Sequence, residues 1–142
     1  MKKYLYIAIL MAFGNGKLIA GEAIIPYWST YADATSCFTI SNISNTAVVF
    51  KFTLYDSDGI KHLGPLNWPK NISALDQDTL LPAHNSAEFC LAAPSNQFGY
   101  GRITTRDEQP SAGKGFVVAR GFGYKTTNIT RGAVISINNS MP

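Results

Sequence analysis

The amino-acid sequence predicts an all-β protein, a single antiparallel β-sandwich of about six to eight strands with an immunoglobulin-like arrangement. Short runs in which apolar and polar residues alternate recur along the chain. Clusters of Gly, Pro, Asn, Asp and Ser separate these runs at intervals of about eight to twelve residues, a spacing typical of sandwiches. Windows of about twelve residues show no convincing amphipathic helix, so strands are the predicted elements.

The clearest alternation lies in the stretch TAVVFKFTLY at residues 46–55. Successive side chains of a strand point to opposite faces, which places Val48, Phe50, Phe52 and Leu54 together on one side. We expect this side to be buried and the opposite side to be exposed. Shorter runs of the same kind are SCFTIS, AEFCLA, YGRITTR, GFVVARGFGY and RGAVISIN.

Residues 64–84 are predicted to be a long connection rather than a central strand. They contain Pro65, Pro69 and Pro82, and proline has no amide hydrogen for a ladder bond. Loops of this length in compact domains are commonly functional or mobile. Trp68, inside the connection, is therefore a candidate for an interaction surface.

The N-terminus predicts export. Lys2 and Lys3 precede an apolar run of about ten residues, the pattern of a signal peptide. This run is about half of what a helix needs to cross a ~30 Å hydrocarbon core, so no stable membrane anchor is expected. We expect residues 1–23 to be the signal peptide and residues 24–142 to be the domain, secreted or located in the periplasm or at the cell surface.

The cleavage site and the charge of the mature chain follow from the same segment. Small residues favour a cut after Ala23, with a cut after Ala20 as the alternative. Removal of residues 1–23 takes away three of the 12 basic and one of the nine acidic residues, which lowers the net charge from +3 to about +1. Without a positive surplus to bind phosphates, nucleic acid is not an expected partner.

Cys37 and Cys90 are the two cysteines of the chain and are predicted to form a disulfide bond. An even pair in an exported protein is more often a disulfide than a metal site or a nucleophile. Closing this loop of about 50 residues would stabilise the fold by about 4 kcal/mol in the loop-entropy description. Two buried free thiols are the alternative.

The stretch DSDG at residues 56–59 resembles both the start of a calcium loop and a β-turn. A twelve-residue calcium loop continues with further oxygen ligands and ends on a bidentate glutamate. Here Gly59 comes too early, and the next four residues supply no carboxylate. Because Asp-Gly is a preferred pair in hairpins, a turn is the favoured interpretation, and calcium would need distant ligands such as Asp76 or Asp78.

Catalytic residues, a metal site and cofactors are not predicted. The two histidines, His62 and His84, match no catalytic or zinc-binding motif. His84 and Glu88 are four apart, which separates them by ~13 Å in the expected strand. Asp107 and Glu108 fit a solvated polar loop, since two adjacent carboxylates do not establish opposed acid and base roles. We therefore expect no enzymatic activity.

Two stretches, FGYGRITT at residues 98–105 and FGYKTT at residues 122–127, alternate glycine with aromatic rings. Glycine allows a ring to pack over the bare backbone of a neighbouring strand, so core strands with glycines at bends or bulges are the favoured interpretation. The alternative is an exposed Tyr and Phe surface that contacts sugar or protein.

A further aromatic cluster, Tyr27, Trp28 and Tyr31, lies in the stretch AIIPYWSTY. Large rings mark either a core or an interface, and with Trp68 these three residues are candidates for an interaction surface. The stretch carries too much apolar surface for a solvated tail, so we expect it to be ordered. Pro26 suits an edge strand because it lacks an amide donor, and edge strands readily pair with another chain.

The stretches FTISNISNTAVVFKFTLYDSDG and TLLPAHNSAEFCL, about residues 38–91, resemble bacterial secreted immunoglobulin-like or fibronectin-like domains. The resemblance implies a β-sandwich outside the cytoplasm, in a group of domains that serve adhesion, assembly, spacing and enzyme accessory roles. Chaperone-assembled pilins are a related group, but the tail AVISINNSMP lacks the penultimate tyrosine expected of that family.

The function predicted from the sequence is an exported, non-enzymatic surface, assembly or binding module. A protein partner or a second copy of the chain, reached through edge strands, is the expected partner. The alternative is a protein that binds or acts on carbohydrate through aromatic and acidic loop residues. Exposed rings in a row would favour the carbohydrate alternative, and buried rings would favour the structural role.

Overall fold

The computed structural model describes residues 21–31, 33–92, 94, 96–108 and 117–125, together with the backbone of residues 131–135. Most of the predicted signal peptide lies outside these residues. The described strands are β1 (Gly21–Tyr31), β2 (Ala34–Asn42), β3 (Val48–Asp56), β4 (Lys61–His62), β5 (Leu66–Lys70), β6 (Thr79–Leu81), β7 (Ser86–Leu91), β8 (Gln97–Asp107), β9 (Val117–Lys125) and β10 (Arg131–Ile135).

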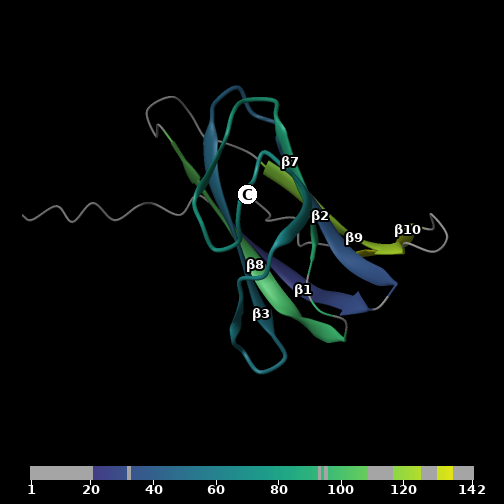
Figure 1. Cartoon of the computed structure of the whole chain (residues 1–142). Coiled ribbons are helices and arrows are strands. Elements are labelled where there is room, and N and C mark those ends of the chain that lie inside the picture. The colour runs from purple at the N-terminus through teal and green to yellow at the C-terminus, as the bar shows by residue number, and fades with distance from the viewer. Residues whose placement is uncertain are drawn as a thin grey trace, which may run out of the picture.

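The strands form one antiparallel sheet that curls into a half-barrel (Figure 1). The prediction of an all-β fold is confirmed. The described residues contain no helix, and accordingly no helix long and apolar enough to cross a membrane. The structure has more strands than predicted because β4, β5 and β6 are additional short strands, of which β5 and β6 belong to the proline-containing region.

The curl of the sheet arises at β2. One edge of β2 pairs with β9 along its whole length, whereas the other edge pairs with β1 only at its start and then with β7. Strand β1 therefore leaves β2 and continues beside β8, which pairs with β3. Two arms result, one with β1, β8 and β3 and the other with β10, β9, β2, β7 and β5, and they occupy different parts of Figure 1.

The core lies between the two arms and is rich in aromatic rings. Phe52 of β3 lies 5.0 Å from Phe89 of β7 and 5.8 Å from Phe38 of β2, measured between ring centroids. Burial of each such ring contributes ~1.5–3 kcal/mol. The remaining large core residues include Ile25, Trp28, Ile40, Val48, Phe50, Leu54, Leu81, Leu91 and Ile103. The predicted buried face of residues 46–55 is thereby confirmed.

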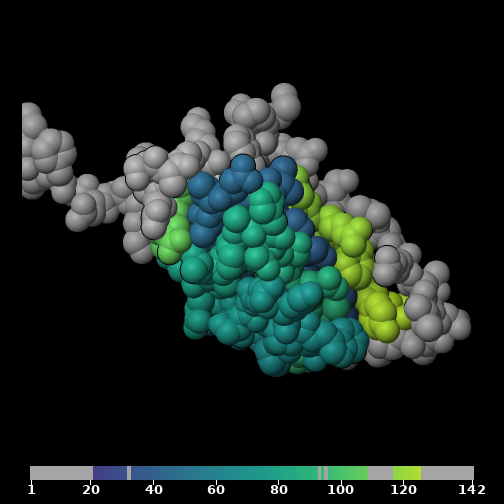
Figure 2. All heavy atoms as spheres, turned by 90° about the horizontal axis from the view of Figure 1, so that it is seen from above, coloured from purple at the N-terminus to yellow at the C-terminus, as the bar shows by residue number. Residues whose placement is uncertain are grey.

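The opposite face of β3 is more covered than the alternation predicted. Val49 and Thr53 are buried, with exposed fractions of 8% and 3%. Val49 lies opposite Leu80 of β6, and the backbone amide of Asp76 donates to the Phe52 carbonyl next to Thr53. The segment between β5 and β7 folds back over β3, which the sequence pattern of β3 alone does not reveal. Seen from above, the middle of the chain, in teal, forms a broad continuous surface beside β9 (Figure 2).

The region of residues 64–84 supplies no central strand, as predicted. Its strand β5 pairs only with β7 among the described strands, and the register shifts between Asn67 and Lys70, where Pro69 lies. Strand β6 pairs with the start of β3. Proline is tolerated here because the strand is at an edge and bulged.

The predicted disulfide is present. Cys37 of β2 and Cys90 of β7 are direct partners in the ladder between these strands, and their sulfurs are bonded. The bond joins residues 53 positions apart and is buried. It therefore fixes β7 to the strand that connects the two arms.

Candidate binding surface on β1, β8 and β3

The side chains of β8 alternate between the two faces of the sheet, so its glycines lie on one face and its aromatic rings on the other. Gly99 and Gly101 face the interior and are buried, whereas Phe98 and Tyr100 point outward with exposed fractions of 51% and 49%. A Cβ atom at Gly99 would collide with the carbonyl oxygen of Tyr55 on β3. The glycines of this stretch thus serve core packing, as the favoured interpretation had it, whereas its rings are exposed, as the alternative had it; the contact with sugar or protein stays a prediction.

Trp28 belongs to the core, so its assignment to an interaction surface is wrong. Its side chain is fully buried, and the indole N–H donates to the backbone carbonyls of Tyr55 (2.9 Å) and Tyr100 (3.1 Å). The ring reaches these carbonyls because the ladder partner of Trp28 is Gly99, which has no side chain. The AIIPYWSTY segment is thus ordered by packing within its own chain.

A β-bulge explains why Trp28 points inward and Tyr27 outward. Ile25 pairs with Gly101, and Trp28 pairs with Gly99, so two residues of β1 lie opposite Tyr100 of β8. The extra residue resets the alternation of side chains. Ile25 and Trp28 can therefore both enter the core while Tyr27 stays on the outer face beside Tyr100.

Five aromatic residues on the outer face of β1, β8 and β3 form what we call the tyrosine face: Tyr27, Tyr31, Tyr55, Phe98 and Tyr100. Tyr55 and Tyr100 are ladder partners with stacked rings, 5.3 Å between centroids and 20° between planes. The hydroxyls of Tyr27 and Tyr31 share a hydrogen bond of 3.2 Å, so these side chains lean toward each other along β1. Phe98 pairs with Ser29, which lies between them in sequence.

Two ion pairs lie beside the tyrosine face. Glu22 and Arg102, neighbours on β1 and β8, approach to 3.6 Å. Lys61 lies 2.6 Å from Asp76. The hydrogen bond between the two hydroxyls raises the pKa of Tyr31, so this phenol stays neutral at physiological pH. The surface therefore presents neutral rings and hydroxyls flanked by compensated charges.

The edge of β1 that faces away from β8 has few partners in the described part of the chain. It pairs with β2 at Thr30 and Tyr31, and the amide of Ser29 donates to the Ser36 hydroxyl (3.0 Å). From Gly21 to Tyr27, the described strands other than β8 offer no ladder partner. Pro26 lies within this stretch, as expected for an edge strand.

Trp68 lies on the other arm, apart from Tyr27 and Tyr31. It is 64% exposed, and its ring meets that of Tyr124 of β9 edge to face at 5.4 Å. Its backbone has a positive φ of 50°, within the bulge of β5. The structure thus brings two of the four predicted surface residues together, buries Trp28, and places Trp68 on a separate face.

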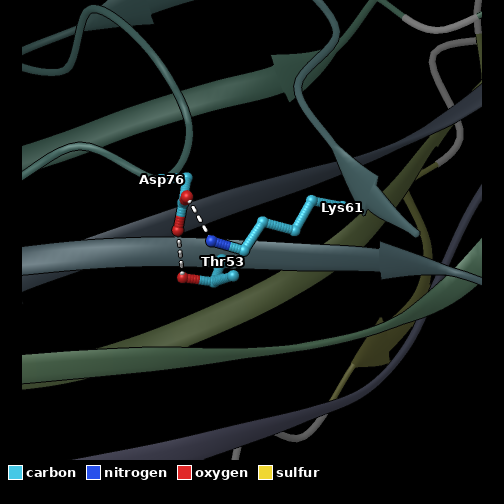
Figure 3. A network of polar contacts seen from close by, with 3 residues as sticks. All are labelled: Thr53, Lys61 and Asp76. Carbon is cyan, nitrogen blue, oxygen red and sulfur yellow. Dashed lines mark hydrogen bonds and ion pairs between the residues drawn. The ribbon is translucent and has the colours of Figure 1, made fainter. Parts of the chain in front are cut away.

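The acidic residues near β3 have structural partners. One carboxylate oxygen of Asp76 accepts from the Thr53 hydroxyl (3.0 Å), and the other accepts from the Lys61 ammonium (Figure 3). The bond with Lys61 holds the pKa of Asp76 below its ordinary value and raises that of Lys61. Asp76 therefore ties its loop to β3 and β4.

The DSDG stretch is a turn, as predicted. The Asp56 carboxylate accepts from the backbone amides of Asp58 (3.0 Å) and Ile60 (2.8 Å). Gly59 has the positive φ of 79° that favours glycine at this position. No group of three His, Cys, Asp or Glu side chains positioned for a metal occurs among the described residues.

His62 is half-buried and packs against Trp28. Its ring lies 4.8 Å from that of Trp28, and its buried Nε2 has no hydrogen-bond partner in the described structure. Burial lowers the pKa of His62, although the nearby Asp56 carboxylate acts in the opposite direction. The imidazole is thus held neutral against the indole.

Tyr55, Phe98 and Tyr100 complete the tyrosine face. Tyr55 was not predicted to lie at a surface, and Phe98 and Tyr100 were so only in the alternative interpretation of FGYGRITT. The alternation of rings and glycines in FGYG was their signal, although it did not show that the rings would lie beside Tyr27. Comparisons with protein-family models, curated proteins and solved structures gave no match.

Proposed function

We propose that this chain is an exported, non-enzymatic assembly module that binds a second copy of itself through the edge of β1. The observation that carries the proposal is the stretch from Gly21 to Tyr27, which has a backbone edge without a ladder partner among the described strands. Such an edge offers amide and carbonyl groups to any extended strand.

A second β1 is the partner that best suits this edge. Two antiparallel β1 strands related by a twofold axis would contribute the same residues to both sides, which is the commonest symmetry of homodimers. Ile24 and Tyr27 are exposed on this strand, and an axis midway between them would place Ile24 of each copy opposite Tyr27 of the other. The sheet of one copy would then continue into the other.

An extracytoplasmic location is part of the proposal. The Cys37–Cys90 disulfide supports it because such bonds persist in oxidising compartments. The signal peptide remains a prediction, and of its two cleavage positions the one after Ala20 suits the fold better. A cut after Ala23 would remove three residues of β1 that pair with residues 103–105 of β8.

We further infer that the half-barrel is an open variant of an immunoglobulin-like sandwich. The contact of Phe38 and Phe89 on one arm with Phe52 on the other supports two facing layers. Such domains commonly serve adhesion and assembly, which agrees with a module that acts by association.

Light scattering coupled to size-exclusion chromatography tests the assembly. We expect the chain from residue 21 onward to have twice the mass of a single chain at high concentration. Ile24→Glu should yield a single chain, because a carboxylate at the edge of β1 opposes pairing with a second strand. Within its own sheet this carboxylate would lie beside the oppositely charged Arg102.

The matched control is Val118→Glu on β9, since Val118 is exposed to a similar degree. This variant should keep the mass of the unmodified protein. A single-chain mass for the unmodified protein at every concentration, or equal loss of assembly in both variants, would refute association through β1.

A further inference from the structure

We propose that the tyrosine face is a binding surface for an uncharged polysaccharide. This inference goes beyond self-association and depends on the outward side chains of β1, β8 and β3 rather than on the backbone edge of β1, although Tyr27 belongs to both surfaces. The five rings are exposed or half-exposed and lie on neighbouring strands.

The arrangement of the rings gives an extended platform rather than a pocket. Tyr55 and Tyr100 stack across β3 and β8, and Tyr27 lies opposite Tyr100 at the bulge of β1. Tyr27 and Tyr31 lean toward each other, with Phe98 on the next strand beside them. The platform thus crosses three strands and also runs along β1, a shape suited to a chain ligand.

The chemistry of the platform favours a ligand with apolar faces and many hydroxyls. A tyrosine ring presents an apolar face and a polar tip, and a pyranose ring likewise has a C–H face and hydroxyls at its rim. Four of the five rings are tyrosines. Stacking on the rings and hydrogen bonds to the phenols could therefore act on the same sugar residues.

The charges determine which polysaccharide is favoured. Two cations lie on strands of the platform or next to it: Arg102 of β8 is paired with Glu22, and Lys61, the ladder partner of Tyr55, is paired with Asp76. A polyanion would have to break these ion pairs before its own charges could pair with Arg102 or Lys61. An uncharged glycan requires no such exchange, and contact of the face with a protein is the alternative that the test below distinguishes.

Affinity electrophoresis in native gels tests the proposal. The probes are hydroxyethylcellulose, dextran and galactomannan, with polygalacturonate as a charged comparison. We expect at least one neutral polysaccharide to slow migration of the protein. Tyr100→Ala should weaken this binding roughly tenfold because it removes the central ring and its stacking with Tyr55, whereas Tyr100→Phe should largely retain it.

Tyr124→Ala is the matched control, since this tyrosine lies on the other arm against Trp68. It should leave the binding unchanged. The proposal is overturned if no neutral polysaccharide slows the protein, if polygalacturonate alone does so, or if Tyr100→Ala and Tyr124→Ala have equal effects. Loss of oligomer mass in Tyr100→Ala without any polysaccharide binding would assign the face to a protein contact instead.

Discussion

The indole N–H of Trp28 donates a 2.9 Å hydrogen bond to the backbone carbonyl of Tyr55, although β8 lies between their strands. This bond connects the core to the tyrosine face, because the Tyr55 side chain stacks on Tyr100 on the outer side of the same sheet. It depends on Gly99, whose missing side chain leaves the carbonyl accessible to the indole.

Gly99→Ala is expected to lower the free energy of unfolding by about 1–3 kcal/mol, the usual cost of forcing extra volume into a packed site. Chemical denaturation measures the change. Gly123→Ala on β9 is the control, since a Cβ there would meet no atom within 4 Å, and it should change stability by less than about 0.5 kcal/mol. Equal effects of the two changes would contradict the packing described for Gly99.

Trp28→Phe is expected to destabilise the protein by about 1–3 kcal/mol, because two partly buried carbonyls lose their donor. Thermal unfolding followed by circular dichroism measures this loss. Trp68→Phe, on an exposed ring, should shift the unfolding temperature far less. The core role of Trp28 would be wrong if both variants had the same unfolding temperature as the unmodified protein.

The disulfide is expected to be a large part of the stability of this domain. Replacing both Cys37 and Cys90 by alanine should lower the free energy of unfolding by about 2–5 kcal/mol. In protein isolated from its native compartment, both thiols should be blocked to alkylation under non-reducing conditions. Two alkylated cysteines would show that the bond does not form there.

Acidification is expected to destabilise the fold through His62. Its pKa is near 6.5 in the unfolded chain and lower in the folded state, so only the unfolded chain takes up the proton in the interval between the two values. The free energy of unfolding is therefore fully retained above about pH 7 and declines as the pH falls toward the folded-state pKa.

Urea unfolding at about pH 7.5 and pH 5.5 measures this dependence. His62→Phe should reduce the pH dependence of the free energy of unfolding. His84→Gln should leave this dependence unchanged, since His84 is exposed and bonded to Asn45. The same pH dependence in His62→Phe as in the unmodified protein would assign the effect to other groups.

Local alternation allowed the buried face of β3 to be predicted, because Val48, Phe50, Phe52 and Leu54 obey a simple period of two. The coverage of Val49 and Thr53 could not be predicted, since it depends on a segment more than twenty residues further along the chain. The small strands β5 and β6 were missed because prolines in or beside them mask weak strand signals at edges. Strand β4 was missed because two residues are too short to show an alternation.

The candidate site was harder to predict because it depends on register between distant strands. The bulge in β1 determines that Trp28 points inward and Tyr27 outward, and no residue pattern in AIIPYWSTY distinguishes the two. Tyr55 and Tyr100 are 45 positions apart and meet only because β3 pairs with β8. Trp68, a candidate for an interaction surface, is exposed, and its position on the other arm follows from the β5–β7 pairing.

Hydrogen exchange of the β1 amides, measured by mass spectrometry in dilute and concentrated protein, tests the proposed assembly most directly. The account predicts that amides between Gly21 and Tyr27 exchange more slowly in concentrated protein, because a second β1 strand covers their edge. Exchange in Ile24→Glu should not depend on concentration. Identical exchange of these amides at both concentrations in the unmodified protein would contradict assembly through β1, whether the amides were exposed in both samples or protected within a single chain.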